Sequence, residues 1–373
     1  MLKDIFGLKT FRSVAVFAAV VLVFGLAACG GGGDGGGPGA PGTKGNPHLI
    51  STAVELAVLA VEVNGGYNKS GVYYKLANDI NLYDYIVGEG WTPIGRTSFS
   101  FSGHFDGNGK TVSNLRIDRS GTNGVGLFGY IKGGTVKNLC VELHGDGITG
   151  NYSVGGVVGS IENGGISNCY VTGKVVGNSS VGGVAGSAYS SSSISNCYAA
   201  GEVSGVAGGD GGIGGVAGLI NNSSVSNSYA TNKVSGLKYV GGVAGDVSGA
   251  GSVSNCAALN QEIVRLVGAE PSFGRVTGSV LASMHSNSNI GFSEMKVCGA
   301  TIAGGVHNDE NGVDIPKGDV TFRSSYEGAS YPLAWNLGLY TDDHPWKWGV
   351  APYSLPILYW QTVSTMSAPP HLF

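Results

Sequence analysis

Charged residues are scarce in this chain of 373 residues, in which Asp, Glu, Lys and Arg together make up 12%. The 21 basic residues form no cluster and the formal net charge is −4. The basic patch that follows a phosphate backbone is therefore missing, and a nucleic acid is not an expected partner. The 67 glycines show no Gly-X-Y period, which excludes collagen, and 42% apolar residues argue against a wholly disordered chain. The composition favours a packed, β-rich protein.

The 6 cysteines include no Cys-x-x-Cys pair, so a zinc site has little support and no metal or cofactor is expected. One cysteine, Cys29, directly follows a predicted export signal. Lys3, Lys9 and Arg12 precede an apolar run, Val14–Leu26, that is too short to span a bilayer. The run ends in Leu-Ala-Ala-Cys29, which resembles the lipobox of bacterial lipoproteins. The resemblance implies that Cys29 carries fatty acid, such as palmitate; an ordinary signal peptide is the alternative.

The composition divides the chain into four parts. Residues 1–28 are the predicted signal peptide, 29–47 a Gly-rich tether, 48–259 a repeat region, and 260–373 final rungs with a capping region. Gly30 stands where some bacterial lipoproteins carry an aspartate that retains them in the inner membrane. By that analogy we expect the bacterial outer membrane or cell surface, with the membrane contacted through the lipid.

A two-part motif recurs along the repeat region. Its first part is an apolar-Gly-Gly-Val-small-Gly phrase, at Val154–Gly159, Val181–Gly186, Ile213–Gly218 and Val240–Gly245. Its second part has the form Ile-Ser-Asn-Cys-Tyr and centres on asparagines, with Asn114 expected to open the series: Asn114, Asn138, Asn168, Asn196, Asn227 and Asn255. The asparagines recur at intervals of about 28 residues, so one structural unit is being stacked.

Inside each phrase apolar and polar residues alternate, which is typical of short strands. Strands that turn at Gly and Asn without helices coil into a solenoid. We therefore predict an all-β, parallel, right-handed β-helix. Ile166, Cys169 and Val171 are expected to point inward, and the asparagines 138, 168, 196, 227 and 255 to form a ladder at one corner.

Two columns are expected to face outward. Lys174, Glu202 and Lys233 would form a charge column that fixes register. Tyr170, Tyr198 and Tyr229 would form an exposed aromatic stripe, the candidate site for a glycan or protein ligand. The alternative for the stripe is purely structural stacking between rungs.

These phrases resemble the GLUG-motif repeats of bacterial surface proteins. Such repeats occur in adhesin-like lipoproteins and in non-catalytic regions of some large secreted peptidases, and the likeness covers roughly residues 48–361. The resemblance implies a structural repeat and carries no shared reaction with it.

Both ends of a solenoid need covering, because an open rung exposes backbone donors and core. Thr52 and Glu55 have capping-box spacing and predict a short N-terminal helix that ends at Gly65-Gly66. Its buried face is expected to hold Ala53, Leu56, Ala57, Ala60 and Val61. The Trp and Tyr residues between 335 and 360 are expected to close the far end.

The sequence does not place the candidate reactive residues together in one site. Cys169 and Cys197 are close enough to be bridged on adjacent rungs, or they are small core side chains. Two segments are expected to form turns: Asp309–Asp314 with His307, with calcium as the alternative, and Asp106–Gly109, with a metal site as the alternative. No acidic pair recurs in register, so no catalytic residue is assigned.

Two functions stay open. The first is a surface-anchored, non-catalytic adhesin or binding protein for a glycan, a host protein or another surface protein. The second is a β-helical carbohydrate-active enzyme, either a polysaccharide lyase or a glycoside hydrolase.

Overall fold

The computed structural model describes residues 39–206, 209, 211–267, 272–280, 285–306, 309–328, 330–335, 337–338, 341, 345–350, 354–361 and 369–373. The predicted signal peptide, Cys29 and most of the tether lie outside the described residues, as does His307.

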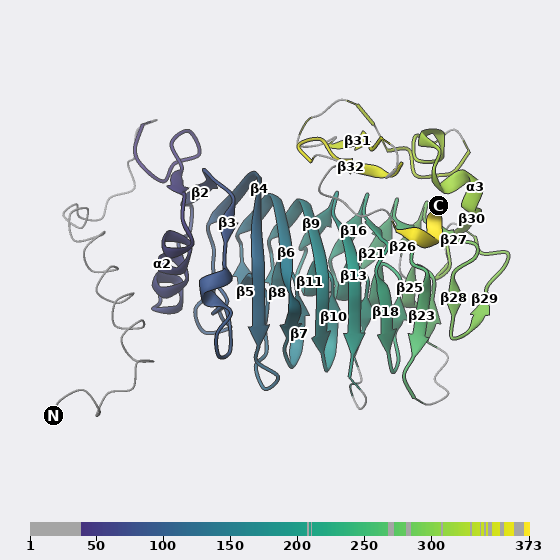
Figure 1. The fold of residues 1–373 in the computed structure, drawn as a ribbon, viewed down its shortest axis with the longest axis horizontal. Helices are drawn as coiled ribbons and strands as arrows, with labels where there is room; N and C mark the ends of the chain where they lie inside the picture. Colours follow the sequence, from purple (N-terminus) through teal and green to yellow (C-terminus); the bar gives the residue numbers. More distant parts are fainter. Residues whose placement is uncertain are drawn as a thin grey trace.

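The described chain is a parallel β-solenoid whose rungs follow one another along a rod (Figure 1). The prediction of an all-β parallel solenoid is confirmed. A 19-stranded sheet forms the broadest wall. Its strands are β1 His48–Ile50, β2 Tyr73–Leu76, β3 Ile80–Asn81, β4 His104–Asp118, β6 Thr135–Thr149, β9 Gly165–Gly177, β12 Ser193–Ser195, β13 Tyr198–Gly205, β16 Ser224–Ser226, β17 Tyr229–Ala230, β18 Lys233–Gly236, β21 Ser252–Ser254, β22 Ala257–Ala258, β23 Glu262–Arg265, β26 His285–Asn287, β27 Ile290–Phe292, β28 Lys296–Val297, β29 Ala300–Thr301 and β30 Val313–Ile315.

Two further sheets complete each coil. The 5-stranded sheet holds β7 Tyr152–Gly155, β10 Ser179–Gly182, β14 Ile213–Gly214, β19 Val240–Gly241 and β24 Phe273–Gly274. The 6-stranded sheet holds β5 Phe128–Lys132, β8 Val158–Glu162, β11 Ala185–Tyr189, β15 Ala217–Asn221, β20 Ala244–Ser248 and β25 Thr277–Val280.

The glycine phrases stack in register and form the tight corner between these two sheets. Val181 pairs with Val154 on one side and with Ile213 on the other, so successive phrases occupy successive rungs. A Cβ added to Gly182 would lie closer to the carbonyl oxygen of Ala185 than van der Waals radii allow. Glycine is required there because the backbone folds back against itself.

The inner side chains form one continuous apolar core. Ile166, Cys169 and Val171 are all buried, as the alternation predicted. Equivalent residues of neighbouring rungs stack on them, for example Val171 against Ala199. Each rung is therefore stabilised by its neighbours rather than by a core of its own.

Helix α2, Ala53–Asn64, covers the N-terminal end of the rod (Figure 1). Its capping box is complete, because the Thr52 side chain accepts from Glu55 N–H and the Glu55 carboxylate accepts from Thr52 N–H. The predicted buried face was only partly right. Val61 is 45% exposed, whereas Val58, Leu59 and Val63 are buried.

The C-terminal segment closes the far end and then folds back along the side of the rod. Short helices α3 Lys317–Val320, η2 Arg323–Ser325 and η4 Pro370–Leu372 lie in it, and η1 Tyr83–Tyr85 lies near the start of the rod. Strands β31 Trp346–Trp348 and β32 Pro356–Leu358 form an antiparallel hairpin. Figure 1 shows this hairpin lying over the wall, away from the end itself. The expectation that these C-terminal aromatic residues close the far end is therefore wrong for Trp346 and Trp360, which pack on Tyr198 and Gly109 along the rod. No helix among the described residues is long and apolar enough to cross a membrane.

Candidate functional site

An open groove lies on the outer side of the first rungs of the wall. It encloses about 660 Å³ and is formed by β1, β2, β4 and β6 with the turn before β1. Its chemically active lining residues are Lys44, Tyr73, Lys75, His104, Asp106 and Lys137. This volume lies within the range of about 300–1,000 Å³ that is usual for ligand sites.

Parallel pairing sets the lining in two rows. Tyr73 pairs with His104 and His104 with Thr135, which forms the first row. Lys75 pairs with Asp106 and Asp106 with Lys137, which forms the second. The rows are separated by two residues along each strand, because alternate side chains share one face.

The first row is aromatic and uncharged at neutral pH. The Tyr73 and His104 rings have centroids 4.4 Å apart and planes tilted by 31°. Burial, and secondarily the positive charge of Lys44, lower the pKa of His104 from its usual 6.5. His104 Nδ1 also shares a hydrogen bond of 2.9 Å with Thr135 Oγ1. The row therefore consists of two neutral rings packed against each other, beside a hydroxyl.

The second row carries most of the charge. Lys137 Nζ lies 3.8 Å from Asp106 Oδ2. Asp106 Oδ1 accepts from Asn108 N–H at 2.8 Å, and so forms the turn predicted here, and from Asn138 Nδ2 at 3.1 Å. Asp106 is thus already engaged by three partners.

The remaining two lysines of the groove have no acidic partner. No ion pair of Lys44 or Lys75 occurs within the part of the chain that the structure describes. With three lysines against one aspartate, the groove carries positive charge in a chain whose formal net charge is −4.

The ladder asparagines lie in one column beside the groove. Asn138, Asn168, Asn196, Asn227 and Asn255 all adopt left-handed backbone, with φ between 48° and 55°. Asparagine is one of the few residues that tolerates this conformation, so it supplies the corner of each rung. Asn168 Nδ2 donates to Asn138 Oδ1 at 3.0 Å.

Asn114 does not open this column, contrary to expectation. Its side chain donates to Asn81 Oδ1 at 3.0 Å, in a different row of the wall. The position next to Asn138 is taken by the Asp106 turn, because a register shift between Asp106 and Lys110 changes the pairing of β4 with β6. The Asp106 carboxylate therefore continues the chain of hydrogen bonds into the groove.

The predicted tyrosine stripe is stacked but not exposed. Tyr170 and Tyr198 have ring centroids 4.0 Å apart, and Tyr198 and Tyr229 4.7 Å. All three are buried, and Tyr198 and Tyr229 have no exposed surface. The expectation of an exposed ligand stripe is wrong, because β31, β32 and Gln361 fold over it.

Specific contacts hold this cover in place. Gln361 Nε2 donates to the Tyr198 hydroxyl at 2.7 Å, and the Tyr229 hydroxyl donates to the carbonyl oxygen of Pro356 at 2.8 Å. The Trp346 ring lies 5.7 Å from that of Tyr229. The tyrosines therefore have the structural role that the sequence left as an alternative.

The charge column follows the predicted register. Glu202 pairs with Lys174 on one side and with Lys233 on the other. Lys233 also forms an ion pair with Glu262, which in turn pairs in register with Lys296. The alternation of sign continues over five rungs and stabilises their stacking.

The buried cysteines occupy core positions. Cys169, Cys197 and Cys256 are free and fully buried, and the thiols of Cys169 and Cys197 donate to the carbonyl oxygens of Ser167 and Ser195. Burial raises the pKa of the Cys169 thiol well above its usual value. They act as small core side chains in this structure.

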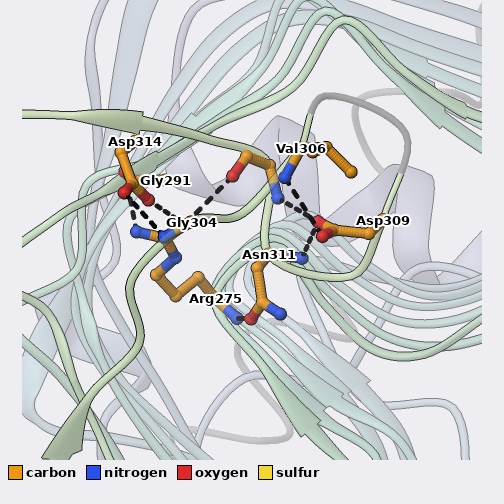
Figure 2. Close-up of polar contacts among 8 residues, drawn as sticks. Arg275, Gly291, Gly304, Val306, Asp309, Asn311 and Asp314 are labelled. Atoms are coloured by element: carbon orange, nitrogen blue, oxygen red, sulfur yellow. Dashed lines mark hydrogen bonds and ion pairs between the residues drawn. The ribbon is translucent and has the colours of Figure 1, made fainter.

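The acidic segment near 309 closes the last rung (Figure 2). Asp309 Oδ1 accepts from the N–H groups of Asn311 and Gly312, and Oδ2 accepts from Val306 N–H. This carboxylate builds the turn that the sequence predicted. Within the described residues no three His, Cys, Asp or Glu side chains are grouped as metal ligands.

Arg275 is fully buried at this end, at the rung position that Gly242 occupies in the preceding rung. Its guanidinium donates to Asp314 Oδ1 at 2.5 Å and to the carbonyl oxygen of Gly312 at 3.0 Å (Figure 2). Burial opposes ionisation of Asp314, but the hydrogen bonds from Gly304 N–H and Arg275 outweigh it and lower the pKa of the carboxyl group. The pair satisfies carbonyl groups that no further rung covers.

Sequence reasoning missed the groove. Tyr73, Lys75, His104 and Lys137 lie before the clear repeats, on strands that belong to different phrases. The alternation Tyr73-x-Lys75 and His104-x-Asp106 was a usable signal, because it places each pair on one side of its strand. The in-register stacking of these two strands could not be read from their spacing of 31 residues alone.

Comparisons with known proteins support the repeat assignment. The family model described as the GLUG motif matches residues 150–176 and 177–204. A protein of Evansella cellulosilytica, provisionally named a Gly-rich membrane protein, is 41% identical over 111 residues, which are 29% of this chain and 12% of that protein. Halomucin of Haloquadratum walsbyi is 34% identical over 159 residues, 41% of this chain and 2% of halomucin. The chain thus matches only a small part of these long relatives.

A solved structure shares the fold. It is a Bacteroides ovatus protein provisionally described as an immunoglobulin A1 protease, with a TM-score of 0.62, 23% identity, and coverage of 86% of this chain and 94% of that one. Identity at this level speaks to the fold alone. The predicted GLUG repeats are confirmed: the chain is a parallel β-solenoid that carries two GLUG motif repeats, at residues 150–176 and 177–204.

Proposed function

We propose that this chain is a non-catalytic binding protein of the bacterial cell surface, which presents a glycan or protein site on a rigid solenoid. The observation that carries the proposal is the open groove of Tyr73, Lys75, His104 and Lys137. It combines half-buried aromatic rings with amines on strands that neighbouring rungs hold in register. Strands held in register need no backbone ordering on binding, which lowers the cost of binding.

The surface location rests on the leader and on the relatives. The sequence around Cys29 resembles a lipobox, and the two relatives are named a Gly-rich membrane protein and halomucin. Each buried acyl CH₂ contributes about 0.8 kcal/mol to membrane binding, so several chains on Cys29 would hold the protein on its membrane. Labelling cells with palmitate tests this anchor. The label should enter the wild type and be absent from Cys29→Ser.

The binding function is tested with the full-length protein, purified from membranes in detergent, on an array of glycans and surface proteins. We expect at least one ligand whose binding falls about tenfold or more in Tyr73→Ala. Tyr152→Ala is the matched control, because Tyr152 is 47% exposed on β7, outside the groove. If every ligand binds the two variants alike, the groove is not the site and the proposal fails.

The carbohydrate-active enzyme is the second candidate. It is favoured by the imidazole, phenol and amines in the groove, which are groups that transfer protons in catalysis. Incubation with a polysaccharide panel decides between the two. Release of unsaturated or reducing sugars that His104→Gln abolishes would replace the binding function with an enzymatic one. Binding without any such release supports the first candidate.

A further inference from the structure

We propose that the groove binds an acidic saccharide, with the sugar ring on the Tyr73 and His104 rings and its carboxylate toward Lys44 and Lys75. This inference rests on the proposed function and adds the chemical class of the ligand.

The charge of the groove selects an anion. Asp106 is engaged by Lys137, Asn108 and Asn138, so it does not neutralise the other two lysines. Lys75 is only partly exposed, and its strand neighbours across the wall are Leu49 and Asp106. A neutral ligand would leave both free amines without a charged partner, and a cationic ligand would be repelled. A carboxylate gains charge-assisted hydrogen bonds, which are about twice as strong as neutral ones.

The arrangement of the two rows fits a sugar ring with a charged substituent. The packed pair of Tyr73 and His104 rings gives an apolar surface beside polar groups, against which a pyranose ring can lie. The aromatic row and the lysine row lie about 7 Å apart, which is two residues along a strand. A ring that packs on Tyr73 and His104 therefore brings a carboxylate at its edge toward Lys75. Thr135 Oγ1, next to His104, offers a partner for a ring hydroxyl.

The surroundings of the groove favour a saccharide over a peptide. A peptide most often joins a sheet by adding a strand to a free edge. At this end of the rod helix α2 covers the first rung (Figure 1), and the edge strand is β1, which pairs with β2 on one side. The groove instead runs across β2, β4 and β6, whose backbone groups are already paired. Recognition there depends on side chains, which suits a chain of sugar rings laid across the strands.

The experiment compares ligands that differ only in charge. Full-length protein in detergent is titrated with polygalacturonate and with its fully methyl-esterified form, which keeps the backbone and loses the carboxylates. Polyglutamate tests for an acidic peptide. We expect polygalacturonate to bind at least tenfold more tightly than the ester or polyglutamate, and added salt to weaken its binding.

Variants then locate the site. Lys75→Gln and Lys44→Gln should each weaken polygalacturonate binding about tenfold, whereas Lys75→Arg should retain most of it. Lys174→Gln removes the same charge from an exposed position outside the groove and should bind like wild type. Circular dichroism of each variant shows that the fold is intact.

Three results would overturn the inference: equal binding of acid and ester, equal or tighter binding of polyglutamate, or full binding by Lys75→Gln. The proposed function survives these results if some other ligand on the array still depends on Tyr73. If no ligand depends on Tyr73, both proposals fail together.

Discussion

Tyr73 and Tyr198 lie on the outer side of the same wall and have opposite surroundings. Tyr73 is partly exposed beside His104 in an open groove, whereas Tyr198 is buried beneath Trp346 and Gln361. The difference arises because the described part of the C-terminal segment covers the middle of the wall and reaches Gly109 of β4 through Trp360, but does not cover Tyr73 and His104. Exposure on a solenoid is thus set by what folds back over it, and strand alternation gives only the direction of a side chain.

The largest effect is expected where the cover meets the wall. Tyr198→Ala removes a fully buried ring that stacks on Tyr170 and Tyr229, so it should lower the free energy of unfolding by about 3–5 kcal/mol. Tyr198→Phe keeps the stack and loses the bond from Gln361, at about 1 kcal/mol. Urea denaturation measures both. Near-equal values for the two variants would mean that the stacked ring contributes little.

A smaller effect is expected at the far end, where Arg275 is buried. Asp314→Asn leaves the guanidinium without its charge partner and should cost about 1–3 kcal/mol at pH 7, toward the lower figure because Asp314 is 36% exposed. Asp118→Asn is the control, since its ion pair with Arg116 is more exposed and should contribute at most about 1 kcal/mol.

The pH dependence of the same pair has a definite sign. The pKa of Asp314 is lowered in the folded protein, so its stabilisation is present above the ordinary pKa of about 3.9 and is lost as the pH falls through the folded value. The gap between wild type and Asp314→Asn in denaturation experiments should therefore close in acid. A gap that stays constant down to pH 2 would show that the carboxylate charge is not involved.

The pKa of His104 tests how close Lys44 lies to the aromatic row of the open groove. Burial and Lys44 lower the pKa of its imidazole, so Lys44→Gln should bring the pKa part of the way back toward 6.5. Histidine resonances followed by NMR during a pH titration measure the change, with His144, which lies outside the groove, as the internal reference. An unchanged pKa would place Lys44 too far away to act on a ligand at His104.

The smallest effect on stability is expected at Tyr73. Tyr73→Ala removes a partly exposed side chain and should change the free energy of unfolding by about 1 kcal/mol or less, measured by the same urea denaturation as Tyr198→Ala. A loss comparable to that at Tyr198 would erase the distinction between the two regions. It would also assign the Tyr73 ring to folding rather than to ligand binding.

Local signals predicted the parts of the fold that depend on neighbouring residues. Thr52 and Glu55 predicted the capping helix, because the hydrogen bonds of a capping box join residues within one helical turn. The asparagine phrases predicted the corners of the rungs, because few residue types other than glycine and asparagine adopt the left-handed backbone found there. The outward tyrosines were assigned the correct direction but the wrong exposure, because their cover comes from residues more than 100 positions later.

The candidate site was less accessible to sequence reasoning. Its four main side chains come from three strands, and they lie side by side only because strands about 30 residues apart in the chain pair in register. Asn114 shows the same difficulty. Its local sequence matches the asparagine phrase of the repeat, but its side chain donates to Asn81 and lies outside the column of the ladder asparagines.

The repeat itself determined that this protein winds into a parallel solenoid, because alternation, tight glycine corners and asparagine turns are local properties that stacking reinforces in every rung. Only the tertiary structure decided which part of the wall is open. The physical reason is that the return of the chain over Tyr198 and Tyr229 depends on long-range burial and on two hydrogen bonds to distant residues, neither of which leaves a periodic trace in the sequence.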